Sequence, residues 1–218
     1  MNLFDIIGPV MVGPSSSHTA GAVKIGLVGR KLLGEDVSSA KIYLHGSFLK
    51  TGKGHGTDRA IVGGLLGLEV DDINIPNSFE IAKERGLDFT IEGMDLGEVH
   101  PNSAKLILKS CTGKELELIA SSLGGGRIEV CEIDGANVRF SGEYATLIVH
   151  NQDRPGLVNE VTGLLGERGV NIATMQLNRK SRGGDAVMVL ECDDCVPEDT
   201  LSWLKNQDGI LSLVYFGK

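Results

Sequence analysis

Hydroxyl and imidazole side chains that could bind a substrate are concentrated in one early stretch, Gly13 to Gly21. Its polar members are Ser15, Ser16, Ser17, His18 and Thr19. A core segment does not collect so many polar side chains, because each buried hydroxyl without a partner costs free energy. Their position before a periodic apolar segment favours recognition of a carboxylate or hydroxyl group at a helix start. The alternative is that these hydroxyls cap the helix and satisfy the loop backbone.

A second polar stretch, Thr51 to Asp58, alternates glycine with charged, imidazole and hydroxyl side chains. The pattern predicts a glycine-rich loop that opens a helix over Arg59 to about Leu68, capped by Thr57 or Asp58. A helix N-terminus attracts anions through its free N–H groups and the positive end of its dipole. The second stretch is therefore another candidate anion site.

The expected anion at this second stretch is a small carboxylate. A Walker phosphate loop needs serine or threonine after its lysine, and here Gly54 follows Lys53. The glycines are spaced GxGxG, whereas the dinucleotide fingerprint is GxGxxG. The predicted substrate anchors are Lys53, Gly54, Thr57 and Asp58.

Two histidines outside the first stretch are further candidates. His55 is the predicted general base, because histidine changes charge near neutral pH and this one stands on a loop that we expect to be flexible. Its alternative roles are helix capping and contact with a partner. His100 and Asn102, in a His-Pro-Asn turn, are weaker substrate-binding candidates that such a turn could use structurally.

The serines and histidine of the first stretch do not predict a hydrolase. Sequence neighbours on a helix cap rarely form a nucleophile–base pair. Neither an acidic third member nor a nucleophile elbow is visible in the sequence.

The elements around these stretches predict an α+β first domain over residues 1–142. The pattern gives a helix over His18 to Leu33, capped by Ser17 or an adjacent hydroxyl, and a strand over Lys41 to Phe48. A short helix and a meander then follow: Ser78–Arg85, Asp88–Ile91, Ala104–Ser110, Glu115–Ser122, Ile128–Ile133 and Asn137–Phe140. We expect an α/β sandwich with helices on one face of a largely antiparallel sheet, and a bulge or close backbone approach at Gly124 to Gly126.

The pattern restarts in residues 143–218, which form the predicted second domain. It reads strand, helix, strand, strand, helix, strand, the ferredoxin-like order. The ranges are Thr146–His150, Gly156–Arg168, Asn171–Leu177, Ala186–Cys192, Pro197–Asn206 and Ile210–Phe216.

Composition restricts the partners and the compartment. The 218 residues carry a net charge of −8, which argues against nucleic acid and against an anionic membrane. No apolar run reaches the roughly 18 residues of a membrane helix, and the N-terminus lacks a signal-peptide pattern. We therefore expect a cytoplasmic protein.

The cysteines do not predict a metal site. Of the four, only Cys192 and Cys195 have CxxC spacing, and no second pair completes a four-ligand set. We expect reduced, structural cysteines, with a redox or intermolecular role for this pair as the alternative.

The second domain resembles an ACT domain. The resemblance rests on Asp153-Arg-Pro-Gly156, the following helix, and Gly169-Val-Asn-Ile172. It implies a regulatory module that pairs across subunits and binds an amino acid between its first loop and a neighbouring domain. The implied effector-binding residues are Asn151, Asp153, Arg154, Pro155, Gly156, Asn171 and Ile172. The alternative is a ferredoxin-like domain kept for dimerisation alone.

The whole chain resembles the β chain of the bacterial iron–sulfur-dependent L-serine dehydratases. The motifs that carry the resemblance occur in the family's order: Gly13–Thr19, Thr51–Asp58, His100–Asn102 and Ser122–Gly126. Members are similar to the regulatory portion of phosphoglycerate dehydrogenases, which combines an α/β sandwich domain with an ACT domain.

This resemblance implies a lyase subunit that converts L-serine to pyruvate and ammonia. A separate α chain would hold a [4Fe–4S] cluster that acts as a Lewis acid at the β-hydroxyl, and this chain would supply no cluster ligand. His55 would then remove the Cα proton, and the two polar stretches would anchor the carboxylate. The alternative is a non-catalytic amino-acid-binding regulatory module related to phosphoglycerate dehydrogenase.

Overall fold

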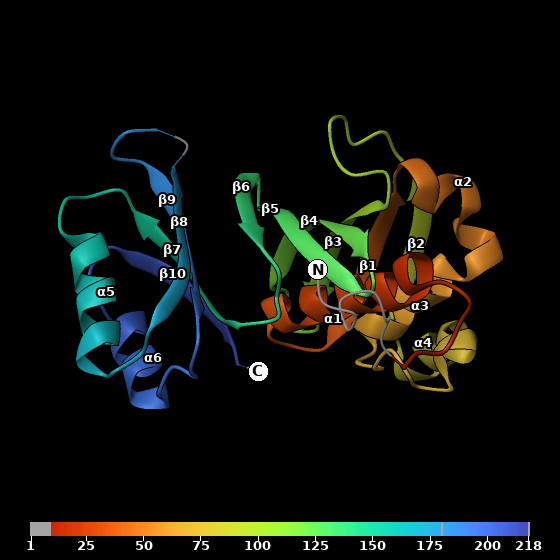
Figure 1. The fold of residues 1–218 in the computed structure, drawn as a ribbon, viewed down its shortest axis with the longest axis horizontal. Helices are drawn as coiled ribbons and strands as arrows, with labels where there is room; N and C mark the ends of the chain where they lie inside the picture. Colours follow the sequence, from red (N-terminus) through yellow and green to blue (C-terminus); the bar gives the residue numbers. More distant parts are fainter. Residues whose placement is uncertain (1–9, 180, 218) are drawn as a thin grey trace. The chain divides into compact units, whose positions relative to one another are not determined.

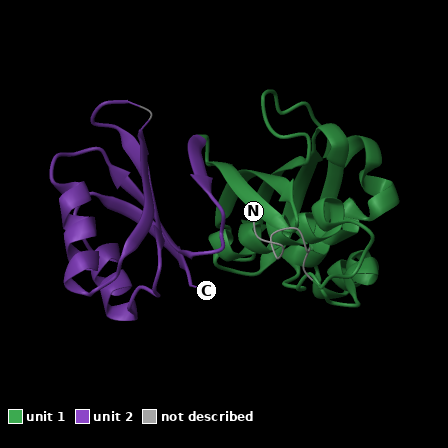
Figure 2. Ribbon diagram, in the orientation of Figure 1, with its two compact units in different colours: residues 1–135 green, residues 136–218 purple. Residues whose placement is uncertain are grey.

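The computed structural model describes residues 10–179 and 181–217, which form two compact units (Figure 2). The units divide between Gly135 and Ala136. Strand β6 (Ala136–Phe140) is therefore grouped with the second unit, and the domain boundary expected after residue 142 stays a prediction.

The first unit combines helices with a mixed sheet (Figure 1). Its elements are η2 (Ser16–Ala20), α1 (Gly21–Leu33), β1 (Val37–Leu44), α2 (Gly46–His55), α3 (Thr57–Leu65), η3 (Ile75–Asn77), α4 (Ser78–Arg85), β2 (Asp88–Gly93), β3 (Ser103–Ser110), β4 (Glu115–Gly124) and β5 (Arg127–Ile133). These strands lie in the order β2-β1-β3-β4-β5. Only β1 and β2 are parallel among these pairings, so the predicted α+β class with a largely antiparallel sheet is confirmed.

Helix α1 packs against β3, β4 and β5 and also against α3. The α1–α3 crossing is close because Gly26 of one helix faces Gly64 of the other. A Cβ atom on Gly26 would collide with the carbonyl oxygen of Ile61, and one on Gly64 with the carbonyl oxygen of Val23. The small residues that follow the first polar stretch thus let the two helix backbones touch.

The first predicted helix starts differently in the structure. Ser16–Ala20 form a single π-helical turn, and regular α-helix begins at Gly21. The N-cap is Ser15, whose hydroxyl accepts from the His18 N–H at 3.1 Å, and not Ser17. The π turn widens the backbone at the polar stretch, a geometry that is frequent at functional sites.

The prediction of a glycine-rich loop over Thr51 to Asp58 was wrong. Strand β1 ends at Leu44, and α2 occupies Gly46–His55 in place of the end of the predicted strand and most of the loop. Tertiary contacts override the low helix propensity of glycine here. The carbonyl oxygen of Pro101 accepts from the first N–H groups of α2, Phe48 is fully buried, and Gly56 ends the helix at φ +68°.

The second unit has the ferredoxin-like order that the sequence predicts. Its elements after β6 are β7 (Ala145–Gln152), α5 (Leu157–Glu167), β8 (Ile172–Arg179), β9 (Asp185–Cys192), α6 (Glu198–Lys205) and β10 (Ile210–Phe216). The strands lie in the order β10-β7-β9-β8, all antiparallel. A core of buried residues from β7, β9, α5 and α6 holds the unit together.

Candidate functional site

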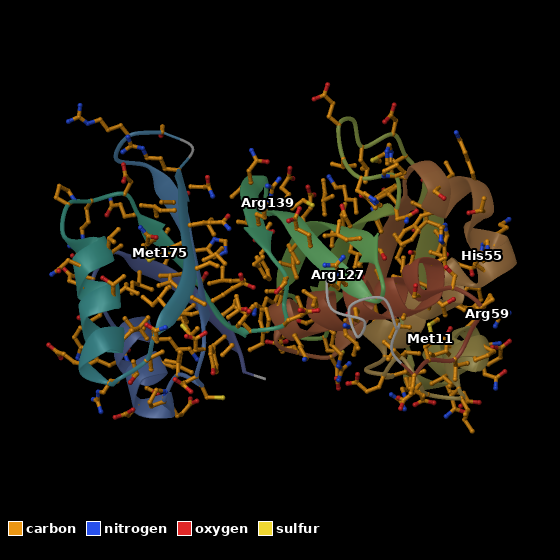
Figure 3. All side chains as sticks on the ribbon, viewed as in Figure 1. Met11, His55, Arg59, Arg127, Arg139 and Met175 are labelled. Carbon is orange, nitrogen blue, oxygen red and sulfur yellow. The ribbon has the colours of Figure 1, made fainter. Side chains whose placement is uncertain are left out.

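The two polar stretches meet in the first unit. His18, in the π turn, lies against the α2 face that carries Ser47, Thr51 and His55 (Figure 3 labels His55). Ser47, Thr51 and His55 are spaced by four residues, so one helix face presents all three side chains. The sequence could not show this meeting, because it depends on how the π turn packs on α2.

His18 binds two hydroxyls of α2 through one ring nitrogen. Its Nε2 lies 3.1 Å from the Ser47 hydroxyl and 3.0 Å from the Thr51 hydroxyl. The Thr51 hydroxyl also donates to the Ser47 carbonyl oxygen at 3.0 Å. Because the Thr51 hydroxyl hydrogen goes to the Ser47 carbonyl oxygen, Nε2–H of His18 is the donor to the Thr51 oxygen and is shared with the Ser47 oxygen, and Nδ1 of the neutral ring is unprotonated.

His55 is the last residue of α2 and is half-buried. Its Nδ1 lies 3.0 Å from the Thr51 carbonyl oxygen. A carbonyl oxygen only accepts, so Nδ1 carries a proton and donates it, and Nε2 has no hydrogen bond among the described residues. The expected flexible loop is therefore replaced by a helix that fixes the tautomer of His55.

The two imidazole rings are neighbours. Their centroids are 4.9 Å apart with the planes inclined by 39°. Phe48 covers His18 edge-on from the other side, at 5.3 Å between ring centroids. Burial and then the nearby His55 hold the pKa of His18 below its usual range. His18 is consequently neutral at neutral pH.

Buried threonine hydroxyls pin the two stretches together. Thr19 donates to the carbonyl oxygen of His55 at 3.1 Å, and Thr57 donates to the carbonyl oxygen of His18 at 2.9 Å. Both side chains are at least 97% buried. Ser15 caps the π turn in the same way. Ser15, Thr19 and Thr57, which were predicted to bind substrate, thus form hydrogen bonds that stabilise the backbone of the site.

Ser16 and Ser17 are half-buried, and no hydrogen bond of either hydroxyl is found among the described residues. Gly54 lies inside α2, where the helix takes up its backbone N–H, so the predicted anion-binding N–H group at this position is absent. Gly56 N–H likewise donates to the Gly52 carbonyl oxygen.

The His-Pro-Asn turn supports the site from behind α2. Pro101 accepts from Ser47 N–H at 2.7 Å, and His100 Nδ1 accepts from Asn102 N–H at 3.1 Å. The carbonyl oxygen of Asn102 accepts from Ser122 N–H at 2.8 Å. The hydrogen bonds of His100 and Asn102 hold the backbone of the turn, which is the structural alternative stated for these residues.

Lys53 and Asp58 are not brought to the histidines. Two positions along an α-helix turn the side chain by about 200°, so Lys53 points away from the face that carries His55. Lys53 and Asp58 line a separate cavity on the other side of α2. Because Lys53 and Asp58 are close to His55 in sequence, we expected them to share one site with it. The structure places them at the cavity instead.

Sequence reasoning missed Ser47 and Thr51 as site residues. Ser47 was assigned to a predicted strand and Thr51 to a predicted loop, so the sequence analysis did not place them on one face of one helix. The spacing of hydroxyl and imidazole residues at 47, 51 and 55 was the available signal.

In the second unit, the β7–α5 loop forms a charged cluster. Arg154 forms a bidentate pair with Glu160 at 3.0 and 2.8 Å, and Asp153 binds Arg179 at 2.7 Å and the Gly183 N–H at 3.0 Å. The Gly183 N–H and Arg179 lower the pKa of the Asp153 carboxyl, and Glu160 raises the pKa of Arg154. Pro155 and Gly156 complete this loop, with Gly156 as the N-cap of α5.

Two implied effector residues lie at the opposite end of the same sheet. Ile172 is level with Cys192 and hence with Ala145, where β7 begins, whereas Asn151 stands near the end of β7. Asn171 binds Asp193 through its side chain at 2.6 Å. Asn171 and Ile172 are therefore separated from the β7–α5 loop within one chain.

The comparisons agree with this architecture. The serine dehydratase beta chain family model matches residues 2–86, and the ACT domain model matches residues 145–208. A probable L-serine dehydratase beta chain of Bacillus subtilis is 41% identical over 97% of this chain and 96% of its own length. This chain belongs to the L-serine dehydratase beta-chain family. A second beta chain, from Peptoniphilus asaccharolyticus, is 40% identical over 91% of this chain and 90% of its own length.

The same beta-chain sequence is related to phosphoglycerate dehydrogenases. The D-3-phosphoglycerate dehydrogenase of Bacillus subtilis is 30% identical over 88% of this chain but only 36% of that enzyme. Among solved structures, the ACT domain of a Chlorobium tepidum GTP pyrophosphokinase covers 33% of this chain at 24% identity, with a TM-score of 0.27. The C-terminal unit of this beta chain is thus an ACT domain by family model and by strand order.

The described part of this beta chain does not fit a cluster. No group of three or more histidine, cysteine, aspartate or glutamate side chains within residues 10–179 and 181–217 is placed to hold a metal ion. Its cysteines are all free, and burial raises the pKa of the Cys192 thiol to about 11, which keeps it protonated. Thiolates are the ligands that clusters require.

In the described residues, no helix is both long enough and apolar enough to cross a membrane. The cytoplasmic location and the exclusion of nucleic acid stay predictions.

Proposed function

We propose that this beta chain supplies half of a substrate site for the conversion of L-serine to pyruvate and ammonia, and that a separate α chain supplies the other half. The observation that carries the proposal is the packing of His18 on the Ser47–Thr51–His55 face of α2. A sensor that only binds an amino acid has no need of two adjacent imidazoles with a fixed tautomer.

In this proposal His55 is the general base. Its Nε2 carries the free lone pair, because Nδ1–H is held by the Thr51 carbonyl oxygen. Nε2 removes the Cα proton of L-serine, and the electron pair of that bond forms the Cα=Cβ double bond. The Cβ–O bond breaks, its electron pair leaves with the hydroxyl, and the hydroxyl takes the proton from His55 Nε2 and departs as water. The resulting aminoacrylate then reacts with water to give pyruvate and ammonia.

His18 is proposed as the positioning residue for His55. Its ring stays neutral, so the imidazolium that forms on His55 meets no second positive charge 4.9 Å away. Ser16 and Ser17, whose hydroxyls have no partner among the described residues, are the proposed contacts to the substrate carboxylate. Ser15, Thr19 and Thr57 act through the scaffold, as their hydrogen bonds indicate.

The [4Fe–4S] cluster is assigned to the α chain in this proposal, since the described residues of this chain do not offer its ligands.

The ACT domain is proposed to pair with a second copy along β8. This strand lies at the sheet edge, and Met175 and Leu177 remain 36% and 42% exposed on the face that β8 shares with Met188 and Leu190. If two β8 strands pair antiparallel, Asn171 and Ile172 of one copy approach the β7–α5 loop of the other. That pairing would assemble the implied effector site from two chains.

The test is anaerobic co-expression of this chain with the α chain, followed by pyruvate measurement from L-serine. The proposal expects activity only when both chains are present. Full activity of the α chain alone would overturn it.

A further inference from the structure

A second cavity lies beside α2, and Lys53, one of its lining residues, stands on the face of the helix opposite His55. Its volume is about 420 Å³, within the range of roughly 300–1,000 Å³ that is typical of small-molecule sites. Its lining residues come from β1, α2, α3, α4 and β2: Leu44, Phe48, Leu49, Lys53, Asp58, Phe79, Phe89, Ile91, Glu92 and Gly93. All of them belong to the first unit.

The walls of this cavity are apolar and aromatic. Phe79 and Phe89 stack at 4.9 Å between ring centroids, and Arg59 lies 4.6 Å from the Phe79 centroid, which fixes that ring. Phe48 is fully buried beneath them. Such walls bind an aliphatic or aromatic side chain.

Charged side chains of both signs also line this cavity, and they form no ion pair among the described residues. Among the described residues, no ion pair or hydrogen bond is found for the Lys53 ammonium or the Glu92 carboxylate. The Asp58 carboxylate accepts only the neighbouring Arg59 N–H, at 2.8 Å. An ammonium beside two carboxylates, none of them in an ion pair among the described residues, is the complement of a zwitterion, whose own carboxylate and ammonium they would bind.

We propose that this cavity binds an α-amino acid with an apolar side chain. Lys53 binds its carboxylate, Asp58 and Glu92 bind its ammonium group, and the phenylalanine walls bury its side chain. L-Serine fits poorly, because its hydroxymethyl group would leave the aromatic walls uncovered and lose its hydrogen bonds. Neither histidine lines this cavity, although Phe48 lines it and also contacts His18, and the ACT loop lies in the other unit.

The test measures binding to the full chain by isothermal titration calorimetry. The probes are L-leucine and L-phenylalanine, with 4-methylpentanoate and 3-methylbutylamine as leucine analogues that lack the ammonium and the carboxylate. Saturable binding of leucine or phenylalanine is expected, at least tenfold weaker for both analogues and for L-serine. Absence of saturable binding of both amino acids overturns the proposal.

Three single variants locate the site. Lys53→Gln is expected to weaken binding at least tenfold, because the carboxylate loses its cation. Lys50→Gln changes an exposed lysine of the same helix outside the cavity and should leave binding within twofold, and Arg154→Gln in the ACT loop should do the same. Any other pattern, including a loss confined to Arg154→Gln, overturns the proposal. Unchanged far-ultraviolet circular dichroism and melting temperature establish that each variant is folded.

Discussion

His18 and His55 come from different elements, and their roles follow from what holds each ring. The Thr51 carbonyl oxygen holds Nδ1 of His55, and the Ser47 and Thr51 hydroxyls hold Nε2 of His18. Thr51 therefore contacts both rings, one through its backbone and one through its side chain. A change at Thr51 would disturb both histidines together.

At this scale we predict that His55→Gln raises the pKa of His18. The positive charge of a protonated His55 is one cause of the lowered pKa, and glutamine removes it. Burial, the larger cause, remains, so the pKa should stay below 6.5, the ordinary value. The measurement is a histidine NMR titration, with Lys50→Gln as the matched control. An unchanged or lower pKa of His18 would contradict the electrostatic coupling.

The same shift makes stability depend on pH. A histidine whose pKa is lower in the folded chain than in the unfolded one binds fewer protons when folded, so unfolding is favoured by acid. The contribution of His18 is fully present above pH 6.5 and is lost as the pH falls toward its folded pKa. Urea unfolding of His18→Gln should therefore show a shallower fall in unfolding free energy below pH 6.5 than the parent chain. An equal slope in both proteins would rule out this contribution.

The residue types of the site could be predicted, and their grouping could not. Ser16, Ser17, His18 and His55 stand out by chemistry alone. Lys53 and Asp58 were grouped with His55 because they are close in sequence, but helical geometry sends them to another cavity. Ser47 and Thr51 could be recognised as site residues only once α2 was known to be a helix.

At the scale of elements, α2 is the segment whose structure sequence patterns describe least well. Gly52, Gly54 and Gly56 each argue against a helix, and only the last of them ends one. Two tertiary interactions stabilise the helix despite these glycines: the Pro101 carbonyl oxygen accepts from its first N–H groups, and Phe48 is buried. Pro101 lies far from α2 in sequence, so local patterns do not reveal this stabilisation. Local patterns succeeded for the strands of the meander, because alternation records which face is buried.

Gly26 and Gly54 both lie inside helices but differ in the space around them, so we predict that alanine has opposite effects at the two positions. Among the described residues, no heavy atom lies within 4 Å of a Cβ placed on Gly54, whereas one on Gly26 collides with α3. Gly54→Ala should therefore raise the unfolding free energy by about 0.5–1 kcal/mol, because alanine is the better helix former. Gly26→Ala should lower it by about 1–3 kcal/mol through overpacking.

Urea denaturation of both variants measures the difference. Two destabilised variants would mean that Gly54 is also sterically constrained. If Gly54→Ala is more stable yet less active with the α chain, the bare backbone of α2 serves the approach of substrate or partner.

At the scale of the whole molecule, the chain divides into a unit that carries the histidine pair and an ACT domain. The ferredoxin-like order was predictable because each element shows its own periodicity. The separation of Asn171 from Asp153 was not, since the resemblance names residues without saying which end of the sheet they occupy.

Self-association through β8 gives the prediction at this scale. Met175→Lys places a charge on the exposed apolar edge (Figure 3) and should shift the chain toward monomer by at least tenfold in dissociation constant. Trp203→Lys on α6, which packs by the other edge strand β10, is the matched control and should leave association unchanged. Analytical ultracentrifugation reports both. A monomeric parent chain, or dissociation by the control alone, would contradict the proposed pairing.

The proposed function depends above all on removal of the Cα proton of L-serine by His55. Its most direct measurement is pyruvate formation by the anaerobically assembled two-chain enzyme, with His55→Gln compared with Lys50→Gln. We predict a fall of at least a hundredfold in kcat for His55→Gln, since general bases contribute about 10²–10⁴-fold, and full activity for Lys50→Gln. Unchanged turnover in His55→Gln would contradict it.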